Sequence, residues 1–430
     1  MKSLWFFLGA LAVATTAVAA DGFRLTPDHA SGIYARHETV GWTLTLQPGA
    51  PAPAGGFAYT LKKDNAVLIK SGRADVHQGK ARFECVGDQP EMVYLEIAAS
   101  AANEKPHAAG AAVAPTEIKP VAPRPSDFDA FWAAKLALSE RVPLNPVVKP
   151  APSGREGVDY ATVRLDHVDG SHVYGQLAKP TRAGKYPAML LMQWAGGPYP
   201  LQKSWVVDRA AEGWLVLNVE PHDVPGDMPQ SFYDALPHLI KAYTTIYDDE
   251  RDRNYFLRMY LGDYRAADYL TGRPDWDGRI FVATGTSMGG QQSFAVAALH
   301  PKVTHMVVLV PAGADAQAAL HGRHESYPDW NVANPKVLET APYFDTVNLA
   351  SRIRATCLVS MGFIDNVCPA VGVWTAYNQI RGRKEAVPLV YAAHNHQSTS
   401  EQLKPYTDRS EQWFAKLVHD EEPDVHASAR

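Results

Sequence analysis

The strongest constraint on the fold is a short apolar segment that runs directly into a serine flanked by glycines and then into a helical stretch. Residues 280–284 are apolar, residues 285–289 are Gly-Thr-Ser-Met-Gly, and residues 291–299 form the helical stretch. A G-x-S-x-G pattern between a strand and a helix is typical of a sharp turn that exposes its serine at the end of a parallel strand. Side chains at positions 285 and 289 would collide with neighbouring elements. The pattern therefore predicts that Ser287 is a nucleophile on such a turn.

Short apolar runs recur on both sides of this turn, separated by amphipathic stretches such as residues 256–270. Strands are predicted at residues 160–165, 172–178, 188–192, 215–219, 280–284, 306–310, 356–360 and 389–391. The last six show little polar alternation, as expected for strands buried on both faces of a parallel sheet. The sequence therefore predicts an α/β-hydrolase fold over residues 126–420. Its doubly wound, mostly parallel sheet would begin with two antiparallel-looking strands.

The residues before this region follow a different pattern. Between residues 21 and 103, short alternating stretches are split by glycine- and proline-rich turns, which predicts a small all-β sandwich domain of immunoglobulin-like type. Residues 104–125 are rich in alanine and proline and predict a linker, and residues 421–430 predict a flexible tail. The role of the sandwich is open between a glycan-binding module and a spacer or oligomer contact. Few of its aromatic residues stand in obviously exposed positions, which favours the structural role.

The N-terminus predicts export from the cell. Lys2 precedes an apolar run at residues 4–13, and small residues follow at 17–20, as in a signal peptide that spans residues 1–20. A retained membrane anchor is the alternative, but the run is too short and too rich in alanine and threonine to be a good one. We therefore expect a secreted or periplasmic protein that is not attached to a membrane after cleavage.

Charge and cysteine content narrow the classes of partner. The net charge is −5, so no basic field is available to bind a nucleic acid. The chain has three cysteines, Cys85, Cys357 and Cys368, and a pair between the last two is the only disulfide considered. The apolar surroundings of Cys357 favour a buried thiol instead. The sequence implies no metal ion and no cofactor.

A serine nucleophile needs a base and a carboxylate, which this fold supplies in the chain order Ser, acid, His. Asp365 stands directly after the predicted strand at residues 356–360, where the acid is expected. Asp345 is its rival, but no strand precedes it. His394 and His396 both follow the last predicted strand, and the spacing from the end of that strand favours His396 as the base.

Two backbone N–H groups are expected to bind the oxyanion that forms during acyl transfer. One belongs to Met288, the residue after the nucleophile, and the other to the loop after the third strand of the sheet. That loop, residues 193–198, contains two adjacent glycines, which would let its backbone approach a bound carbonyl group closely. Ala195 or Trp194 is the expected second donor, and an ordinary glycine-rich turn is the alternative.

With these motifs in order, residues 115–418 resemble the acetyl xylan esterase and cephalosporin C deacetylase family of carbohydrate esterases. The resemblance rests on PSDFDAFW at residues 125–132, YFLRMYLGDYRAADYL at 255–270, RPDWD at 273–277, RIFVATGTSMGGQ at 279–291 and GFIDNVCP at 362–369. It implies that Ser287 is the nucleophile and Asp365 the acid. The family also has its catalytic histidine five residues after a tyrosine at the end of the last strand, which implies His396 after Tyr391.

Two departures from the family pattern lie beside the expected acyl site. Met288 stands where the family usually has glutamine, and residues 193–195 are Gln-Trp-Ala where the family usually has His-Gly-Tyr. The backbone donors survive both changes, but the wall beside the acyl group differs. The signal peptide and the β region resemble longer secreted relatives, and the resemblance also implies assembly into a homo-oligomer.

The predicted function is removal of acetyl groups from a carbohydrate, xylan or a xylo-oligosaccharide, through an acyl-enzyme on Ser287. Feruloyl or other acyl esters are alternative substrates. A secreted prolyl-oligopeptidase-like peptidase would share the order of the triad, but such enzymes generally carry a large propeller domain that the short β region cannot supply. A carbohydrate-binding protein with an inactive hydrolase domain would be expected to have lost a member of the triad.

Overall fold

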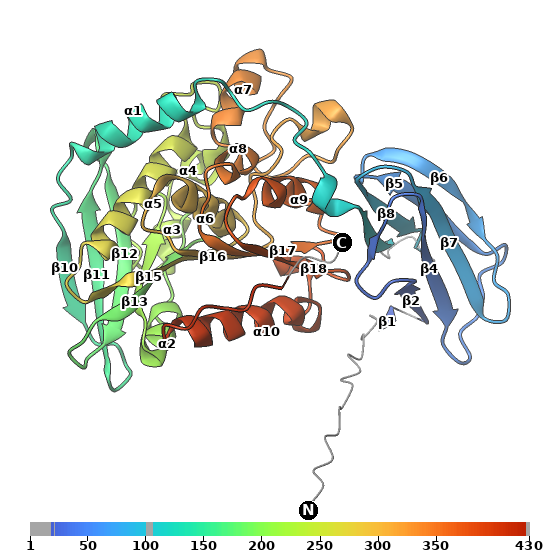
Figure 1. The fold of residues 1–430 in the computed structure, drawn as a ribbon, viewed down its shortest axis with the longest axis horizontal. Coiled ribbons are helices and arrows are strands. Elements are labelled where there is room, and N and C mark those ends of the chain that lie inside the picture. The colour runs from blue at the N-terminus through green and yellow to red at the C-terminus, as the bar shows by residue number, and fades with distance from the viewer. Residues whose placement is uncertain (1–18, 21, 100–105, 427–430) are drawn as a thin grey trace, which may run out of the picture.

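The computed structural model describes residues 19–20, 22–99 and 106–426, and its larger part is built on a nine-stranded sheet (Figure 1). The order across the sheet is β10-β11-β12-β14-β13-β15-β16-β17-β18. These strands are β10 (Val147–Ala151), β11 (Val158–Asp166), β12 (His172–Pro180), β13 (Tyr186–Met192), β14 (Leu215–Glu220), β15 (Trp276–Thr286), β16 (His305–Leu309), β17 (Thr356–Gly362) and β18 (Lys384–Leu389). The strands from β14 to β18 pair in parallel, and β10, β11, β12 and β14 pair antiparallel.

This arrangement confirms the predicted α/β-hydrolase sheet with antiparallel strands at its start. The sequence did not single out β10, whose residues are all exposed. The last strand also differs from its prediction. It was expected at residues 389–391, but β18 spans Lys384–Leu389. This shift changes the position of everything counted from the end of that strand.

Helices cover both faces of the sheet (Figure 1). On one face, α2 (Ser204–Glu212) and α10 (Ser400–Leu417) pack against β12, β14 and β18. On the other face lie α5 (Tyr255–Thr271), α6 (Met288–Leu299), α8 (Thr346–Ala350) and α9 (Ala370–Gln379), with α1 (Phe128–Glu140) packed on α5. All 12 residues of α6 are buried, including the polar residues Gln291, Gln292 and Ser293, so the helix is enclosed in the core.

Short helices occupy the connections at and near the edges of the sheet. They are α3 (Gln230–Asp234), α4 (His238–Lys241) and α7 (Pro335–Thr340), with 3-10 turns η1 (Pro115–Glu117), η2 (Val168–Gly170), η3 (Tyr243–Thr245), η4 (Ala318–His321), η5 (Ala341–Tyr343) and η6 (Asn395–Gln397). Several of these connections follow the carboxyl ends of parallel strands, where α/β folds place their functional groups.

The N-terminal part consists of two β-sheets around a hydrophobic core of their own (Figure 1). One sheet has the order β1-β2-β4-β7 and the other β3-β9-β8-β5-β6. The strands are β1 (Ala19–Ala20), β2 (Phe23–Pro27), β3 (Ile33–Tyr34), β4 (Glu38–Leu46), β5 (Phe57–Lys63), β6 (Val67–Ala74), β7 (Lys80–Gly87), β8 (Glu91–Ile97) and β9 (His107–Val113). Large apolar side chains such as Trp42 and Phe83 fill the space between the two sheets. We call this part the sandwich.

The expected linker at residues 104–125 needs correction. Residues 107–113 form β9, which pairs antiparallel with β8 and in parallel with β3. The alanine and glycine content that predicted an open linker instead allows close packing. A side chain at Gly110 would collide with the backbone of Phe363 in the hydrolase part. Small residues therefore mark a contact surface here.

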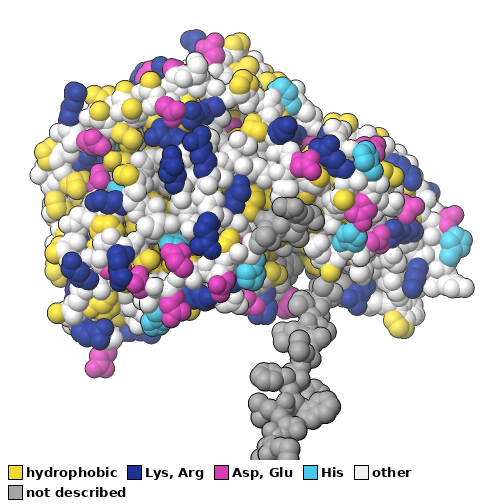
Figure 2. All heavy atoms as spheres, viewed as in Figure 1, with side chains coloured by type: hydrophobic (Ala, Val, Ile, Leu, Met, Phe, Trp, Pro, Cys, Tyr) yellow, Lys and Arg dark blue, Asp and Glu magenta, His cyan; other side chains and the backbone are white. Residues whose placement is uncertain are grey.

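The two ends of the chain are described only in part. The predicted signal peptide lies outside the described residues except for Ala19 and Ala20, which pair with β2 as β1. The predicted tail is bonded to the protein over residues 421–426: Asp424 pairs with Lys416, and the His426 N–H donates to Glu385. Within the described residues no helix is long and apolar enough to cross a membrane. Figure 2 shows cationic and anionic side chains intermixed on the visible face.

Candidate active site

Ser287 stands on a tight turn between β15 and α6. Its backbone has φ 57° and ψ −120°, a conformation that side chains other than glycine rarely adopt and that is typical of strained functional turns. Its N–H donates to Leu309 O at 3.0 Å, and its carbonyl accepts the Ala312 N–H at 3.0 Å. The turn is thus anchored on the neighbouring strand β16 and the residues after it.

The glycines of this turn are required by close packing, as predicted. A Cβ at Gly285 would lie 2.5 Å from the carbonyl carbon of Gly289, and a Cβ at Gly289 would lie 2.5 Å from the carbonyl oxygen of Met192. Real Cβ atoms do not approach backbone so closely, so a larger residue would displace the turn. The second contact brings the turn against the end of β13.

His394 lies between Ser287 and Asp365. Its Nε2 is 2.9 Å from Ser287 Oγ, and its Nδ1 is 2.7 Å from Asp365 Oδ2. All three side chains are buried, with exposed fractions of 4%, 3% and 2% for Ser287, Asp365 and His394. A serine, an imidazole and a carboxylate in this order are the groups that make a hydroxyl nucleophilic.

The structure places His394, and not the expected His396, between Ser287 and Asp365. His396 is exposed, and its ring lies edge-on to the His394 ring at a centroid distance of 5.2 Å. Two features of the backbone explain the difference. Strand β18 ends at Leu389 and turns at once, with the Ala392 N–H donating to Leu389 O, and the 3-10 turn η6 then carries His396 away from the site. Counting from residue 391 placed the base two residues too late.

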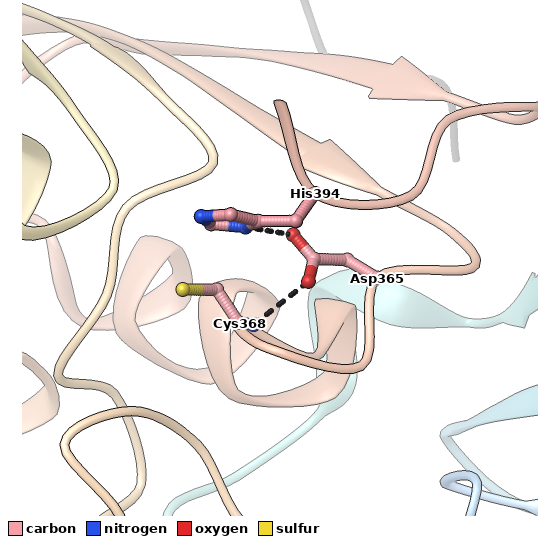
Figure 3. A group of neighbouring side chains, drawn as sticks. All are labelled: Asp365, Cys368 and His394. Carbon is pink, nitrogen blue, oxygen red and sulfur yellow. Dashed lines mark hydrogen bonds and ion pairs between the residues drawn. The ribbon is translucent and has the colours of Figure 1, made fainter. Parts of the chain in front are cut away.

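Asp365 is held by the loop that follows β17. Its Oδ1 accepts the N–H groups of Val367 and Cys368, each at 2.8 Å, while Oδ2 faces His394. Figure 3 shows the carboxylate pointing from this loop to the imidazole. With both oxygens bonded, the carboxylate has one orientation, as needed to hold the imidazole in one tautomer.

Asp345, the rival acid, lies elsewhere in the structure. It caps the N-terminus of α8, where its side chain accepts the N–H groups of Val347, Asp315 and Ala316 at 2.8 to 3.1 Å. Burial, followed by the nearby Asp315 carboxylate, raises the pKa of Asp345 to about 7. Its role is to close a helix end and a loop.

The turn of Ser287 is tied to the loop that carries Ala195. In addition to the Gly289 contact, the Gln292 side chain donates to Gln193 O at 2.9 Å. Ala195 itself is half-buried, and Trp194 is exposed and stacks on Tyr199. Met288 is the first residue of α6, so no carbonyl group one turn earlier in the helix can accept its N–H. Both expected oxyanion donors thus belong to one interlocked unit.

A thiol lies beside the nucleophile. The Cys368 side chain is within hydrogen-bonding distance of Ser287, and burial, followed by the Asp365 charge, raises the pKa of this thiol well above its usual range. A neutral thiol is a poor nucleophile. Cys85, Cys357 and Cys368 are all free, so the disulfide considered between the last two does not form.

Cys368, Asp365 and His394 also form a group whose polar atoms lie within 4.8 Å of one another, a spacing that a metal ion would tolerate (Figure 3). However, both nitrogens of His394 and both oxygens of Asp365 already have partners inside the protein. The arrangement is therefore accounted for by hydrogen bonding between these residues.

Two tyrosines form a wall next to the nucleophile. The Tyr243 hydroxyl donates to Met288 Sδ at 3.0 Å and is bonded to the Tyr327 hydroxyl, which lies 3.4 Å from the same sulfur. The backbone of Gly196 lies near the Tyr243 hydroxyl, and burial raises the pKa of Tyr243 to about 12. The wall thus joins Met288 to the loop that carries Ala195.

A buried polar group supports this wall from behind. The His222 ring lies 4.7 Å from the Tyr243 ring, and its Nδ1 is 2.9 Å from the Tyr255 hydroxyl. Burial lowers the pKa of His222 to about 3, which keeps it neutral, and raises the pKa of Glu220 to about 8. At the end of β14, the Glu220 carboxyl group accepts a hydrogen bond from the backbone N–H of His222 at 2.8 Å.

The structure brings the predicted residues Ser287 and Asp365 into one site through His394, whereas the two tyrosines were not predicted. Tyr243 and Tyr327 lie in irregular connections, where no periodicity marks a buried side chain. Cys368 was considered only for a disulfide, although its position three residues after Asp365 places it on the same loop. That spacing is the one signal that indicated its proximity to the site.

Comparison with known proteins gives a consistent result. The acetyl xylan esterase (AXE1) family profile matches residues 116–417. The acetyl esterase Axe7A of Xylanibacter ruminicola is 30% identical over 414 residues, which cover 93% of each chain. An alignment of this extent reaches beyond the hydrolase part into the sandwich.

Two solved structures share the fold of the hydrolase part. The acetyl xylan esterase from Paenibacillus sp. R4 superposes with a TM-score of 0.60 at 22% identity, covering 71% of this chain and 98% of that chain. Acetyl xylan esterase 1 from Thermoanaerobacterium sp. JW/SL YS485 has a TM-score of 0.57 at 23% identity, covering 70% of this chain and 97% of that chain.

Proposed function

Since the chain belongs to the acetyl xylan esterase family and is a carboxylic ester hydrolase, we propose that it removes acetyl groups from xylan or xylo-oligosaccharides through an acyl-enzyme on Ser287. The observation that carries the mechanism is the position of His394, with one nitrogen 2.9 Å from Ser287 Oγ and the other 2.7 Å from Asp365. The substrate of this protein is thus a small-molecule or oligosaccharide ester.

In the first half-reaction, Ser287 Oγ attacks the acetyl carbonyl carbon while His394 Nε2 accepts the hydroxyl proton. Asp365 holds the opposite nitrogen and stabilises the imidazolium that forms. The C–O bond to the sugar then breaks, and His394 returns the proton to the departing sugar oxygen. The products of this step are the deacetylated saccharide and acetyl-Ser287.

In the second half-reaction, a water molecule attacks acetyl-Ser287 and gives its proton to His394. Collapse of this tetrahedral intermediate releases acetate, and the proton returns to Ser287 Oγ. In both steps the negative charge on the carbonyl oxygen would be stabilised by the N–H groups of Met288 and Ala195 and by the N-terminus of α6.

The wall of Tyr243, Tyr327 and Met288 supports a small acyl group. These side chains bond to one another beside Met288, the residue after Ser287, and are buried or half-buried, which is consistent with a confined acyl site. The predicted signal peptide at residues 1–20 supports export to a compartment in which polymeric xylan is accessible.

The decisive experiment measures acetate release from acetylated xylan and from p-nitrophenyl acetate, with wild type and Ser287→Ala side by side. Cleavage of both substrates by the wild type and of neither by the variant is the expected result. If the wild type cleaves only the small ester, the saccharide substrate is wrong. If Ser287→Ala retains activity on either ester, the acyl-enzyme mechanism is wrong.

A further inference from the structure

We propose that the sandwich is part of the catalytic apparatus because it positions the loop that carries Asp365. We call residues 363–368 the acid loop. The positioning residues are Gly110, on β9, and Asp64, on the turn between β5 and β6. The inference rests on the proposed role of Asp365 and gives the sandwich a function beyond that of a spacer.

The first contact is a close approach of two backbones. A Cβ at Gly110 would lie 2.8 Å from the Cβ of Phe363 and in even harder contact with the Phe363 carbonyl oxygen. Phe363 is only 3% exposed and stands two residues before Asp365. Gly110 therefore lets β9 lie directly against the acid loop, and its missing side chain is what permits the contact.

Neighbouring strands of the same sheet extend this contact. A Cβ at Gly32, next to β3, would lie 3.0 Å from the Phe363 ring and 3.2 Å from Val390, on the segment that leads to His394. Burial raises the pKa of Tyr94 on β8, and the charges of Glu96 and then Asp365 raise it further. Tyr94 therefore lies close to Asp365. One face of the sandwich thus lies behind both the acid and the base.

The second contact begins at Asp64, which is 3% exposed. Its Oδ1 accepts the Met92 N–H at 2.8 Å within the sandwich, and its carbonyl accepts the His324 N–H at 3.0 Å across the interface. Its Oδ2 also lies 3.8 Å from the Arg323 guanidinium, which donates to Asp315 at 2.6 Å. Asp64 therefore anchors the segment at residues 323–327 through its backbone carbonyl and through the ion pair of its buried carboxylate.

This segment leads to the acid loop. The Tyr327 N–H donates to Val367 O at 2.9 Å, and the Val367 N–H donates in turn to Asp365 Oδ1 at 2.8 Å. Asp64 is thus connected to the catalytic carboxylate through a continuous series of bonds. The acid loop is supported by β9 on its N-terminal side and by the Asp64 connection on its C-terminal side.

If the sandwich only stabilises the fold, a variant that stays folded keeps its kcat. If the sandwich positions Asp365, a folded variant can lose kcat. Displacing a catalytic group by about 1 Å costs up to about 100-fold in rate, even when the protein stays folded. The experiment therefore compares kcat and KM for p-nitrophenyl acetate at a temperature at which circular dichroism shows every variant to be fully folded.

Gly110→Ala is the main variant and Gly72→Ala its control. Gly72 lies on β6 of the same sheet, where a Cβ would meet the Tyr59 ring at 3.6 Å, an ordinary contact. We expect Gly110→Ala to lower kcat by about tenfold to 100-fold with KM within about twofold of wild type, and Gly72→Ala to leave both unchanged. A folded Gly110→Ala with wild-type kcat overturns the proposal, as does an equal loss in both variants.

If Gly110→Ala does not fold, Asp64→Asn decides the question, with Asp28→Asn as its control. Asp28 pairs with Arg82 inside the sandwich, whereas Asp64 pairs with Arg323 across the interface, so each variant removes one sandwich carboxylate from an ion pair and only Asp64→Asn affects the interface. A lower kcat at unchanged KM in Asp64→Asn alone supports the proposal, and wild-type kcat overturns it. Ser287→Ala assayed in parallel separates the two proposals, because residual activity there refutes the mechanism itself.

Discussion

The turn that carries Ser287 and the loop that carries Asp365 follow strands of one sheet but are held in different ways. The turn is held by its own glycines and by backbone bonds to the adjacent strand β16. The acid loop is also bonded to its adjacent strand end, through the N–H groups of Phe363 and Ile364, but in addition it receives a bond from residue 327 and packs against β9 of the sandwich. Ser287 is therefore positioned within the hydrolase part alone, whereas Asp365 also depends on contacts with the sandwich.

The largest effect is expected at the base that joins these two regions. His394→Ala removes the bond to both Ser287 and Asp365 and should lower kcat by about 10⁶-fold, as loss of a triad histidine does. His396→Ala should leave kcat within about threefold of wild type, because that side chain is exposed and bonds to neither residue. Steady-state hydrolysis of p-nitrophenyl acetate measures both. A larger loss of kcat in His396→Ala than in His394→Ala would identify His396 as the base.

A somewhat smaller effect is expected for the acid itself. Asp365→Asn leaves the shape of the loop intact but permits the wrong tautomer of His394, so kcat should fall by about 10⁴-fold. Asp345→Asn, at a helix cap, should lower the thermal midpoint and leave kcat near that of wild type. Equal losses of kcat in the two variants would contradict the assignment of Asp365 as the acid.

The tight packing of the Ser287 turn is tested through the stability of the folded protein. Gly289→Ala places a methyl group against the carbonyl oxygen of Met192 and should lower the free energy of unfolding by about 1–3 kcal/mol, measured by chemical denaturation. Gly72→Ala provides the control for a glycine without such a contact. Unchanged stability of Gly289→Ala would mean that the turn relaxes easily and is held no more tightly than the acid loop.

The last prediction concerns the end of a third strand, β14, where the stability of the folded protein depends on the protonation of Glu220. Burial raises the pKa of Glu220 to about 8, so the folded protein keeps a proton that the unfolded chain loses near pH 4.5. The stability contributed by this proton is complete below about pH 4.5 and is lost as the pH rises through about 8. Between pH 5 and pH 9 the thermal midpoint of wild type should therefore fall more than that of Glu220→Gln. Parallel curves for the two proteins would contradict this.

Local patterns made the sheet and the nucleophile predictable. Buried parallel strands have a recognisable apolar composition, and the glycines around Ser287 belong to a short motif that can be read without knowing what they pack against. The order of triad residues then located Asp365, because the end of β17 is marked by an apolar run.

The remaining features depend on contacts between distant segments. The base was misplaced by two residues because neither the end of β18 nor the 3-10 turn η6 leaves a periodic signal. Strand β9 resembled a linker because its small residues are selected by the acid loop, far along the chain. Tyr243 and Tyr327 meet only in the folded molecule, so no segment of the sequence indicates their contact with Met288.

The packing of β9 against the acid loop also sets an order of events during biogenesis. Gly110 emerges from the ribosome first, and Phe363 follows roughly 250 residues later, so the face of the sandwich that receives it stays uncovered through most of synthesis. Activity should therefore arise only after the last strands dock, and a chaperone that shields this face would act on the enzyme before it can cleave any ester.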